Sequence, residues 1–334
     1  MSLYAVDAID DAIDATKSFL WPFDRGRWLR LALIVLFVGG SGGFSPFQFT
    51  GGTPTGTGSD VSLPSEAPSP EFVAPGGVEL LVIVAIFALI AALVFGLLFV
   101  GSVMEFVFVE SLRREAVSIR RYWGEYWRIA TRLFGFRILF GAVTLALVLA
   151  TLALALSPLA FGSGGAAIAL VILAVPVFIV ISIVSGLVGA FTTKFVVPIM
   201  LVESRGVLSA WRRFWPTLVG QWKQYAAYAL ISFVLQIATG ILTAIVVVLG
   251  AVVAAIPFGV LGVAGAALLS VSELGGGVVI GVAALLFVCA VVALGLIVAV
   301  PVQTYLRYYA LLVLGDTEAE FDLIADRRQA IREE

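Results

Sequence analysis

Glu105, Lys194 and Arg307 are charged residues inside otherwise apolar runs, and each stands five to nine residues before the acidic residue that ends its run. A charged side chain that faces lipid costs about 2.5–3.5 kcal/mol at the centre of a membrane helix and less near its edge. An acidic side chain and two basic side chains can form ion pairs with one another. We therefore expect Glu105, Lys194 and Arg307 to converge as an intramembrane charge cluster. In the alternative interpretation, Lys194 and Arg307 extend to the membrane surface and do not meet.

Two residue types that are common in catalytic and metal sites, His and Cys, are absent or nearly absent from the chain. It has no His, no Asn and a single Cys, Cys289. Without His, a hydroxyl nucleophile lacks its usual base, and a lone Cys makes neither an intrachain disulfide nor a soft-metal site. No Walker phosphate loop and no dinucleotide fingerprint occurs. We therefore expect no catalytic residues, no metal, no cofactor and no enzyme activity.

The composition indicates that such a cluster would lie in a membrane protein. Of the 334 residues, 61% are hydrophobic and 13% are charged, whereas an ordinary soluble domain is about 25% charged. A soluble protein of this length could not bury so much apolar surface in its core, so a lipid bilayer must surround part of the chain. The sequence predicts an all-α integral membrane protein with six transmembrane helices, in the apolar runs near 28–44, 78–108, 133–156, 167–200, 225–256 and 277–314. The first run is the weakest, since only 28–38 is solidly apolar.

The basic residues are confined to four groups along the chain. All twenty Lys and Arg lie within 17–30, 113–137, 194–223 and 307–332. None lies in the three predicted external loops, near 41–77, 157–166 and 257–276. Basic residues stay on the cytoplasmic side because they translocate poorly. A topology with six spans in the cell (plasma) membrane and both termini in the cytoplasm places every one of these basic residues on the cytoplasmic side.

Related motifs recur along the chain. "WPFDRGRW" (21–28) has the same pattern as "WPTLVGQW" (215–222). "VESLRREAVSIRRYW" (109–123) matches "VESRGVLSAWRRFW" (202–215) with a one-residue gap. Matched order over a dozen positions indicates an internal repeat, whereas shared interfacial composition alone would not keep that order.

The repeats predict three hairpins, each preceded by a cytoplasmic amphipathic in-plane helix. Their bounds are near 4–110, 111–203 and 204–316. All three belong to one polytopic membrane domain over 1–334. A stretch rich in Gly and Pro at 39–77 predicts a flexible external loop, and 317–334 is expected to be a cytoplasmic tail.

The N-terminal segment predicts an amphipathic helix. Its apolar residues follow helical spacing at Leu3, Val6, Ile9, Ile13 and Leu20. This pattern is typical of a helix that lies on the membrane surface. In the alternative, a soluble helix packs on other cytoplasmic segments.

Aromatic and basic residues of the in-plane segments are candidates for contact with lipid headgroups. Trp favours the interface because its ring is apolar while its N–H needs a polar partner, and Arg attracts anionic headgroups. The candidates are Trp21, Trp28, Arg120, Arg121, Trp123, Arg212, Arg213, Trp215 and Trp222. The competing interpretation is that these Arg residues only enforce the topology.

The segment "VVPIMLVESRGVLSAWRRFWPTLVGQW" (196–222) resembles the six-span membrane domain found beside some glycerophosphodiester phosphodiesterases. The N-terminal "AIDATKSFLWPFDRGRWLRLALI" (12–34) looks like an uncharacterised haloarchaeal branch of that set. The phosphodiesterase catalytic domain, with its metal ligands, has no counterpart in this sequence. The resemblance therefore implies a fold and a membrane role but no hydrolase activity.

Two functions remain open from the sequence. The first is a structural, accessory or lipid-interacting membrane protein, whose partners are membrane lipids or a cytoplasmic or membrane protein, with no nucleic acid. The alternative is a transporter or lipid-handling protein with a polar path between the hairpins. Convergence of polar residues inside the membrane would favour the alternative. The sparse Ser, Thr and Gln of the spans favour the first function.

Overall fold

The computed structural model of the protein describes residues 4–38, 77–161 and 164–333, which form helices without any strand among them. The helices are α1 (Tyr4–Leu20), α2 (Arg25–Val38), α3 (Gly77–Arg113), α4 (Ile119–Leu156), α5 (Gly164–Phe191), α6 (Val197–Glu203), α7 (Val207–Gly220), α8 (Trp222–Leu269), α9 (Glu273–Thr317) and α10 (Ala325–Glu333). Short helical turns lie at η3 (Ser157–Phe161), η4 (Thr192–Val196) and η5 (Ala319–Phe321). The prediction of an all-α protein is confirmed. The predicted external loop lies, up to residue 76, outside the described residues.

Five of the described helical segments are long and apolar enough to cross a membrane. They are Leu80–Arg113, Ile119–Leu159, Ile168–Glu203, Trp222–Leu269 and Glu273–Thr317. The described part of the first predicted span, α2, has 14 residues, which is fewer than the roughly 20 that a spanning helix needs. The count of six spans and the threefold repeat therefore stay predictions.

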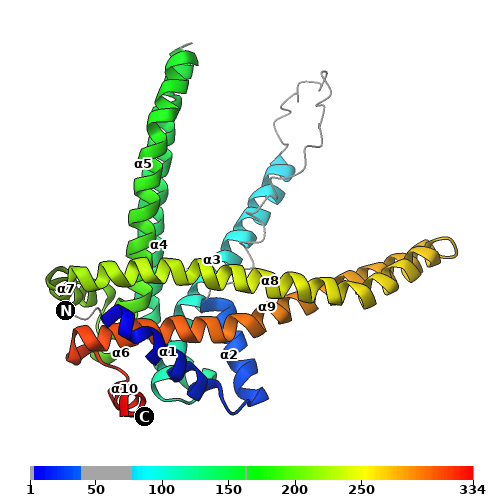
Figure 1. The fold of residues 1–334 in the computed structure, drawn as a ribbon. Coiled ribbons are helices and arrows are strands. Elements are labelled where there is room, and N and C mark those ends of the chain that lie inside the picture. The colour runs from blue at the N-terminus through cyan, green and yellow to red at the C-terminus, as the bar shows by residue number, and fades with distance from the viewer. Residues whose placement is uncertain (1–3, 39–76, 162–163, 334) are drawn as a thin grey trace.

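The long helices are arranged as diverging arms (Figure 1). Helices α4 and α5 pack against each other as one arm, α8 and α9 as a second, and α3 leaves in a third direction beside α2. The arms meet at one end, where α1, α6, α7 and α10 gather.

The distal parts of the arms expose apolar side chains on nearly all sides. Phe87 on α3, Leu154 on α4 and Val252 on α8 are each more than 60% exposed, and most of their neighbours along the helices are exposed as well. An apolar surface of this extent marks a membrane-embedded or interaction surface, because it would drive association in water. The arms are thus suited to lipid.

The buried core lies where the arms meet. Residues 306–315 of α9 are all buried, because α1, α2, α8 and η4 surround this end of the helix. Phe106 and Phe108 of α3 and Ile199 of α6 are fully buried in the same core. The C-terminal end of α9 is therefore the central element of the fold.

Helix α1 packs on this core through small side chains. Ala5, Ala8, Ala12 and Ala15 are 0% exposed, and the helix contacts α9, α8 and α10. The Tyr309 hydroxyl donates a hydrogen bond of 2.8 Å to the carbonyl oxygen of Ala5. Two of the predicted apolar positions of α1, Val6 and Ile13, are exposed on its outer side. The helix therefore packs on other segments of the protein, as in the alternative interpretation, through an alanine face that the sequence pattern did not single out. Of the five predicted apolar positions, Leu3 lies outside the described residues.

A separate short helix precedes the long apolar helix in only part of the chain. The second predicted in-plane helix is wrong: Ile119 begins a single 38-residue helix, α4, which runs into the apolar arm without a break. No Pro interrupts residues 119–156, so nothing forces the chain to turn. By contrast, α7 ends at Gly220 and the chain turns at Gln221 before α8.

The two Trp-Pro motifs take different local structures. Pro22 lies in the connection between α1 and α2, whereas Pro216 lies inside α7. The shared motif therefore does not specify a shared turn.

The tip of the α8–α9 arm is tighter than the predicted loop at 257–276. Helix α8 continues through Pro257 to Leu269, and α9 begins at Glu273. The Ser272 hydroxyl caps α9 by accepting a hydrogen bond of 3.1 Å from the amide of Gly275. A Cβ at Gly276 would lie 2.6 Å from the backbone nitrogen of Leu269 and 2.7 Å from the carbonyl oxygen of Gly265. Glycine therefore permits the close approach of the two helices at this tip.

Candidate functional site: a cationic cluster where the arms meet

A buried ion pair joins the first and last predicted repeats. The Arg307 guanidinium, on α9, contacts the Glu105 carboxylate, on α3, through Nη2 and Oε2. Their side chains are 1% and 2% exposed. A buried charge is tolerated when it is paired and hydrogen-bonded, so this contact ties α3 and α9 together.

Arg137 is a second partner of Glu105. Its Nη2 lies 3.4 Å from Oε1 of Glu105 and donates a hydrogen bond of 3.2 Å to the hydroxyl of Thr193. Its Nη1 lies 3.4 Å from the hydroxyl of Ser102. In the sequence, Arg137 stands in the basic group 113–137, which is predicted to be cytoplasmic, and it was not predicted as part of the cluster. The uninterrupted α4 carries it to the depth of Glu105.

The turn η4 supplies a backbone acceptor to the cluster. Between α5 and α6 the helix widens to a π-turn, in which the amide of Val197 donates to the carbonyl of Thr192. In this register the next donor would be Pro198, which has no N–H, so the carbonyl of Thr193 is left without a helical partner. The Arg307 Nη1 fills that place with a hydrogen bond of 2.6 Å to the Thr193 oxygen. Pro198 is the sequence signal that could have indicated this acceptor.

Lys194 lies on the same turn but makes a different contact. Its side chain lines a cavity of about 440 Å³ between α5, α8 and α9, together with Glu105 and Arg307. It is within electrostatic range of both residues, but among the described residues no carboxylate oxygen is within 4.0 Å of its amine. The structure therefore brings together Glu105 and Arg307 and places Lys194 beside them without an ion pair.

A second cavity flanks the cluster on its other side. It has a volume of about 270 Å³, lies between α3, α4 and α5, and is lined by Glu105, Arg137 and Thr193 among others. Polar groups of the cluster are thus reachable from two cavities whose remaining walls are mainly apolar. A functional role for this cluster stays a prediction.

The predicted interfacial residues fall into two groups. Trp21, Trp215 and Trp222 are exposed. Trp28 and Trp123 are partly buried, and their rings pack on Phe23 and Phe99, with centroids 5.2 and 6.4 Å apart. The partly buried pair thus packs within the protein, and contact of the exposed Trp residues with lipid stays a prediction.

The predicted headgroup-binding arginines also differ from one another. Arg120, Arg121 and Arg212 are exposed and make no ion pair with any described residue. Arg213 pairs with Glu203 at 3.7 Å and with Glu320. Its guanidinium also lies 5.7 Å from the ring centroid of Phe321. Arg213 is thus paired within the protein although it is exposed, while the other three are exposed and have no ion-pair partner among the described residues.

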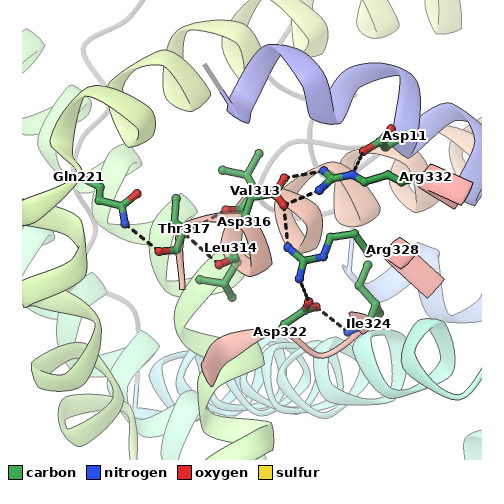
Figure 2. A network of polar contacts seen from close by, with 10 residues as sticks. All are labelled: Asp11, Gln221, Val313, Leu314, Asp316, Thr317, Asp322, Ile324, Arg328 and Arg332. Atoms are coloured by element: carbon green, nitrogen blue, oxygen red, sulfur yellow. Dashed lines mark hydrogen bonds and ion pairs between the residues drawn. The ribbon is translucent and has the colours of Figure 1, made fainter. Parts of the chain in front are cut away.

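The segment after α9, which the sequence predicts to be a cytoplasmic tail, folds back onto the core (Figure 2). Asp316, at the end of α9, accepts from Arg328 at 2.6 Å and from Arg332 at 2.8 and 2.9 Å. Arg328 also pairs with Asp322 at 2.6 Å, and Arg332 pairs with Asp11 of α1 at 2.9 Å. The hydrogen bond with Asp316 is the main factor that raises the pKa of the Arg332 guanidinium above its usual range. These contacts form a C-terminal clasp, made of Asp11, Asp316, Asp322, Arg328 and Arg332, that holds α10 against α1 and α9.

Asp316→Asn should loosen this clasp. We expect the free energy of unfolding to fall by about 1.5–3 kcal/mol, since charge-assisted hydrogen bonds to two arginines are lost but both guanidinium groups can turn to water. Limited trypsin digestion followed by mass spectrometry should show faster cleavage after Arg328 and Arg332. Asp326→Asn, at an exposed position of α10, is the matched control and should leave the cleavage rate unchanged. Equal rates in the two variants would show that the clasp does not hold the segment.

The comparisons with known proteins provide a family and no activity. No curated protein and no solved structure matches the chain. The resemblance to the membrane domain beside phosphodiesterases therefore stays a prediction. The sequence pattern of a family of unknown function, DUF7544, matches residues 3–324, and the chain belongs to that family.

Proposed function

We propose that this chain is an integral protein of the cell membrane that interacts with lipids and has no catalytic activity of its own. The observation that carries the proposal is the pairing of long, exposed apolar arms with a polar cluster where they meet. Arms of this kind are soluble only in lipid. The absence of His from the sequence and the single Cys support a binding role over a chemical one.

A second candidate, lipid handling along a polar path, is supported by one specific observation. Glu105, Arg137 and Arg307 converge, and cavities of about 440 and 270 Å³ lie on the two sides of the cluster. Intramembrane ionisable groups are costly and commonly mark a path for a polar group. The two candidates share lipid as the partner and differ in whether that lipid moves.

Helix α7 supports the interfacial part of the proposal. Its inner face buries Val207, Ala210 and Phe214. Its outer side exposes Leu208 and Trp215 next to the unpaired Arg212. A helix with aromatic and aliphatic residues beside Arg is typical of one that lies in the headgroup region.

Replacing Arg120, Arg121 and Arg212 together by Gln tests headgroup binding. We expect the co-purifying anionic lipid to fall by about half or more, since each basic residue near an anionic surface contributes about 1 kcal/mol. The measurement is lipid mass spectrometry on protein extracted in a mild detergent. Arg213→Gln is the control because Arg213 is already paired, and it should leave the lipid content unchanged. Unchanged lipid in the triple variant would leave topology as the only role of these residues.

Cysteine labelling tests the proposed orientation, in which both termini lie in the cytoplasm. On a Cys289→Ser background, Ser209→Cys on α7 should react with a membrane-impermeant maleimide only after the cells are opened. Ser270→Cys, at the exposed tip of the α8–α9 arm, should react in intact cells, because no basic residue lies between 224 and 306. Labelling of both positions from the same side would contradict the orientation.

A further inference from the structure

We propose that the cavity between α5, α8 and α9 binds a phosphate group, and that the phosphate belongs to the headgroup of an anionic lipid. Lys194 would hold the phosphate, and the lipid chain would lie along the groove between α5 and α8. The site rests on the membrane-embedded role proposed above, and it adds to that role a ligand class and a place in the fold.

The charges around the cluster do not balance. Among the residues that line the two cavities, Glu105 is the only carboxylate, and it stands against three cations, Arg137, Lys194 and Arg307. An excess of two positive charges in surroundings of low dielectric constant is costly unless an anion compensates it. The missing negative charge indicates an anionic ligand.

Lys194 is the cation left for that ligand. The two oxygens of Glu105 are already engaged, Oε2 by Arg307 and Oε1 by Arg137. Lys194 has no carboxylate oxygen within 4.0 Å among the described residues, and its side chain lines the larger cavity. Gln303 and Gln236 line the same cavity and can donate to phosphate oxygens. An ammonium group and neutral amide donors around one cavity suit a phosphate.

The part of the cavity between α5 and α8 forms a mainly apolar groove, which suits an acyl chain. Helices α5 and α8 belong to different arms and diverge from this point (Figure 1). Ile183 on α5 and Phe233 on α8 line the cavity and are both more than 60% exposed. Gly186 lines the same cavity, and a Cβ placed on it would meet no atom within 4 Å, so there is open space beside this residue. An apolar groove that opens toward lipid and ends at a cation fits an amphiphile better than a free ion.

Native mass spectrometry of the full-length protein in a neutral detergent tests the site. The probes are dioctanoyl phosphatidylglycerol, dioctanoyl phosphatidylcholine and inorganic phosphate. We expect one molecule of the anionic lipid to bind in clear preference to the neutral lipid. Lys194→Met should weaken that binding about tenfold, since one charge-assisted contact is lost. Lys223→Met, which removes an exposed lysine outside the cavity, is the matched control and should bind as the unchanged protein does.

Gly186→Leu distinguishes the lipid from the free ion, because it fills the groove and leaves every charge in place. Weaker lipid binding in this variant, with no competition from inorganic phosphate, supports the lipid. If phosphate displaces the lipid and Gly186→Leu has no effect, the ligand is the free ion and the lipid assignment is overturned. If folded Lys194→Met binds the anionic lipid as tightly as the unchanged protein, the site is overturned. Should Lys194→Met not fold, Gly186→Leu decides alone.

The outcome also separates this site from the proposed function. If the unchanged protein is not recovered from the membrane fraction, the membrane-embedded role fails. If it is recovered there and neither Lys194→Met nor Gly186→Leu alters lipid binding, the membrane role stands and only the site fails.

Discussion

Replacing Glu105 by Gln is expected to lower the free energy of unfolding by about 3–5 kcal/mol, because removing one partner of a buried pair leaves an uncompensated charge. Glu105 is the shared counterion of Arg307 and Arg137. Arg307 is 1% exposed, so its charge would stay buried without this counterion. The measurement is the shift in the midpoint of unfolding by sodium dodecyl sulfate, followed by circular dichroism of the protein in mixed micelles.

The pairing also predicts rescue. Adding Arg307→Met to Glu105→Gln should recover a large part of the loss, because the stranded charge is removed together with its partner. Adding Lys194→Met instead should recover a smaller part, since Lys194 lies near the cluster without an ion pair. Glu125→Gln is the control: Glu125 pairs with Arg114 at 3.6 Å on the surface, and its loss should cost less than about 1 kcal/mol. Additive effects of the two single changes would show that the cluster is not a coupled unit.

Truncating Phe195 to Ala should lower the free energy of unfolding by about 3–5 kcal/mol, the range for removing a buried aromatic side chain. Phe195 follows Lys194 on the π-turn and is 0% exposed. Its ring packs against Tyr228, Tyr225 and Phe214, with centroids 4.8, 5.2 and 5.5 Å away. These contacts fasten the turn to α7 and α8, so the same unfolding measurement should show the loss.

Phe233→Ala is the matched control for Phe195. Phe233 is 62% exposed on α8, where its ring faces apolar surroundings whether the arms are assembled or apart. Its truncation should shift the unfolding midpoint by less than about 1 kcal/mol. Equal shifts for Phe195→Ala and Phe233→Ala would show that the aromatic contacts around the π-turn do not stabilise the assembly.

The sequence predicted the helices better than their arrangement. Composition and apolar runs fix helix class and approximate spans, because backbone groups in lipid must be satisfied within the helix. The directions of the arms could not be predicted, since a helix that is apolar on all sides has no periodicity to show which face meets a neighbour. The alanine face of α1 was missed for a related reason: Ala5 and Ala8 are too weakly apolar to stand out beside Val6 and Ile13.

The charge cluster, too, could be predicted only in part from the sequence. Glu105 and Arg307 could be identified because a charge inside an apolar run is conspicuous. Arg137 was not, because it stands in a stretch of several arginines and only an uninterrupted α4 brings it to that depth. The C-terminal clasp was missed because nothing in the sequence shows which acidic and basic residues pair. Only the fold brings Asp316 to Arg328 and Arg332.

The distance along the chain between Glu105 and Arg307 has a consequence for biosynthesis. The two residues are 202 positions apart, and α9 is the last of the described helices that are long and apolar enough to cross a membrane. While α3, α4 and α5 enter the bilayer, Glu105 can reach Arg137 but not Arg307, and the Thr193 carbonyl has no donor. Each partly synthesised chain therefore carries an incompletely neutralised polar patch until α9 is inserted. Such a patch distinguishes an unfinished chain from a finished one.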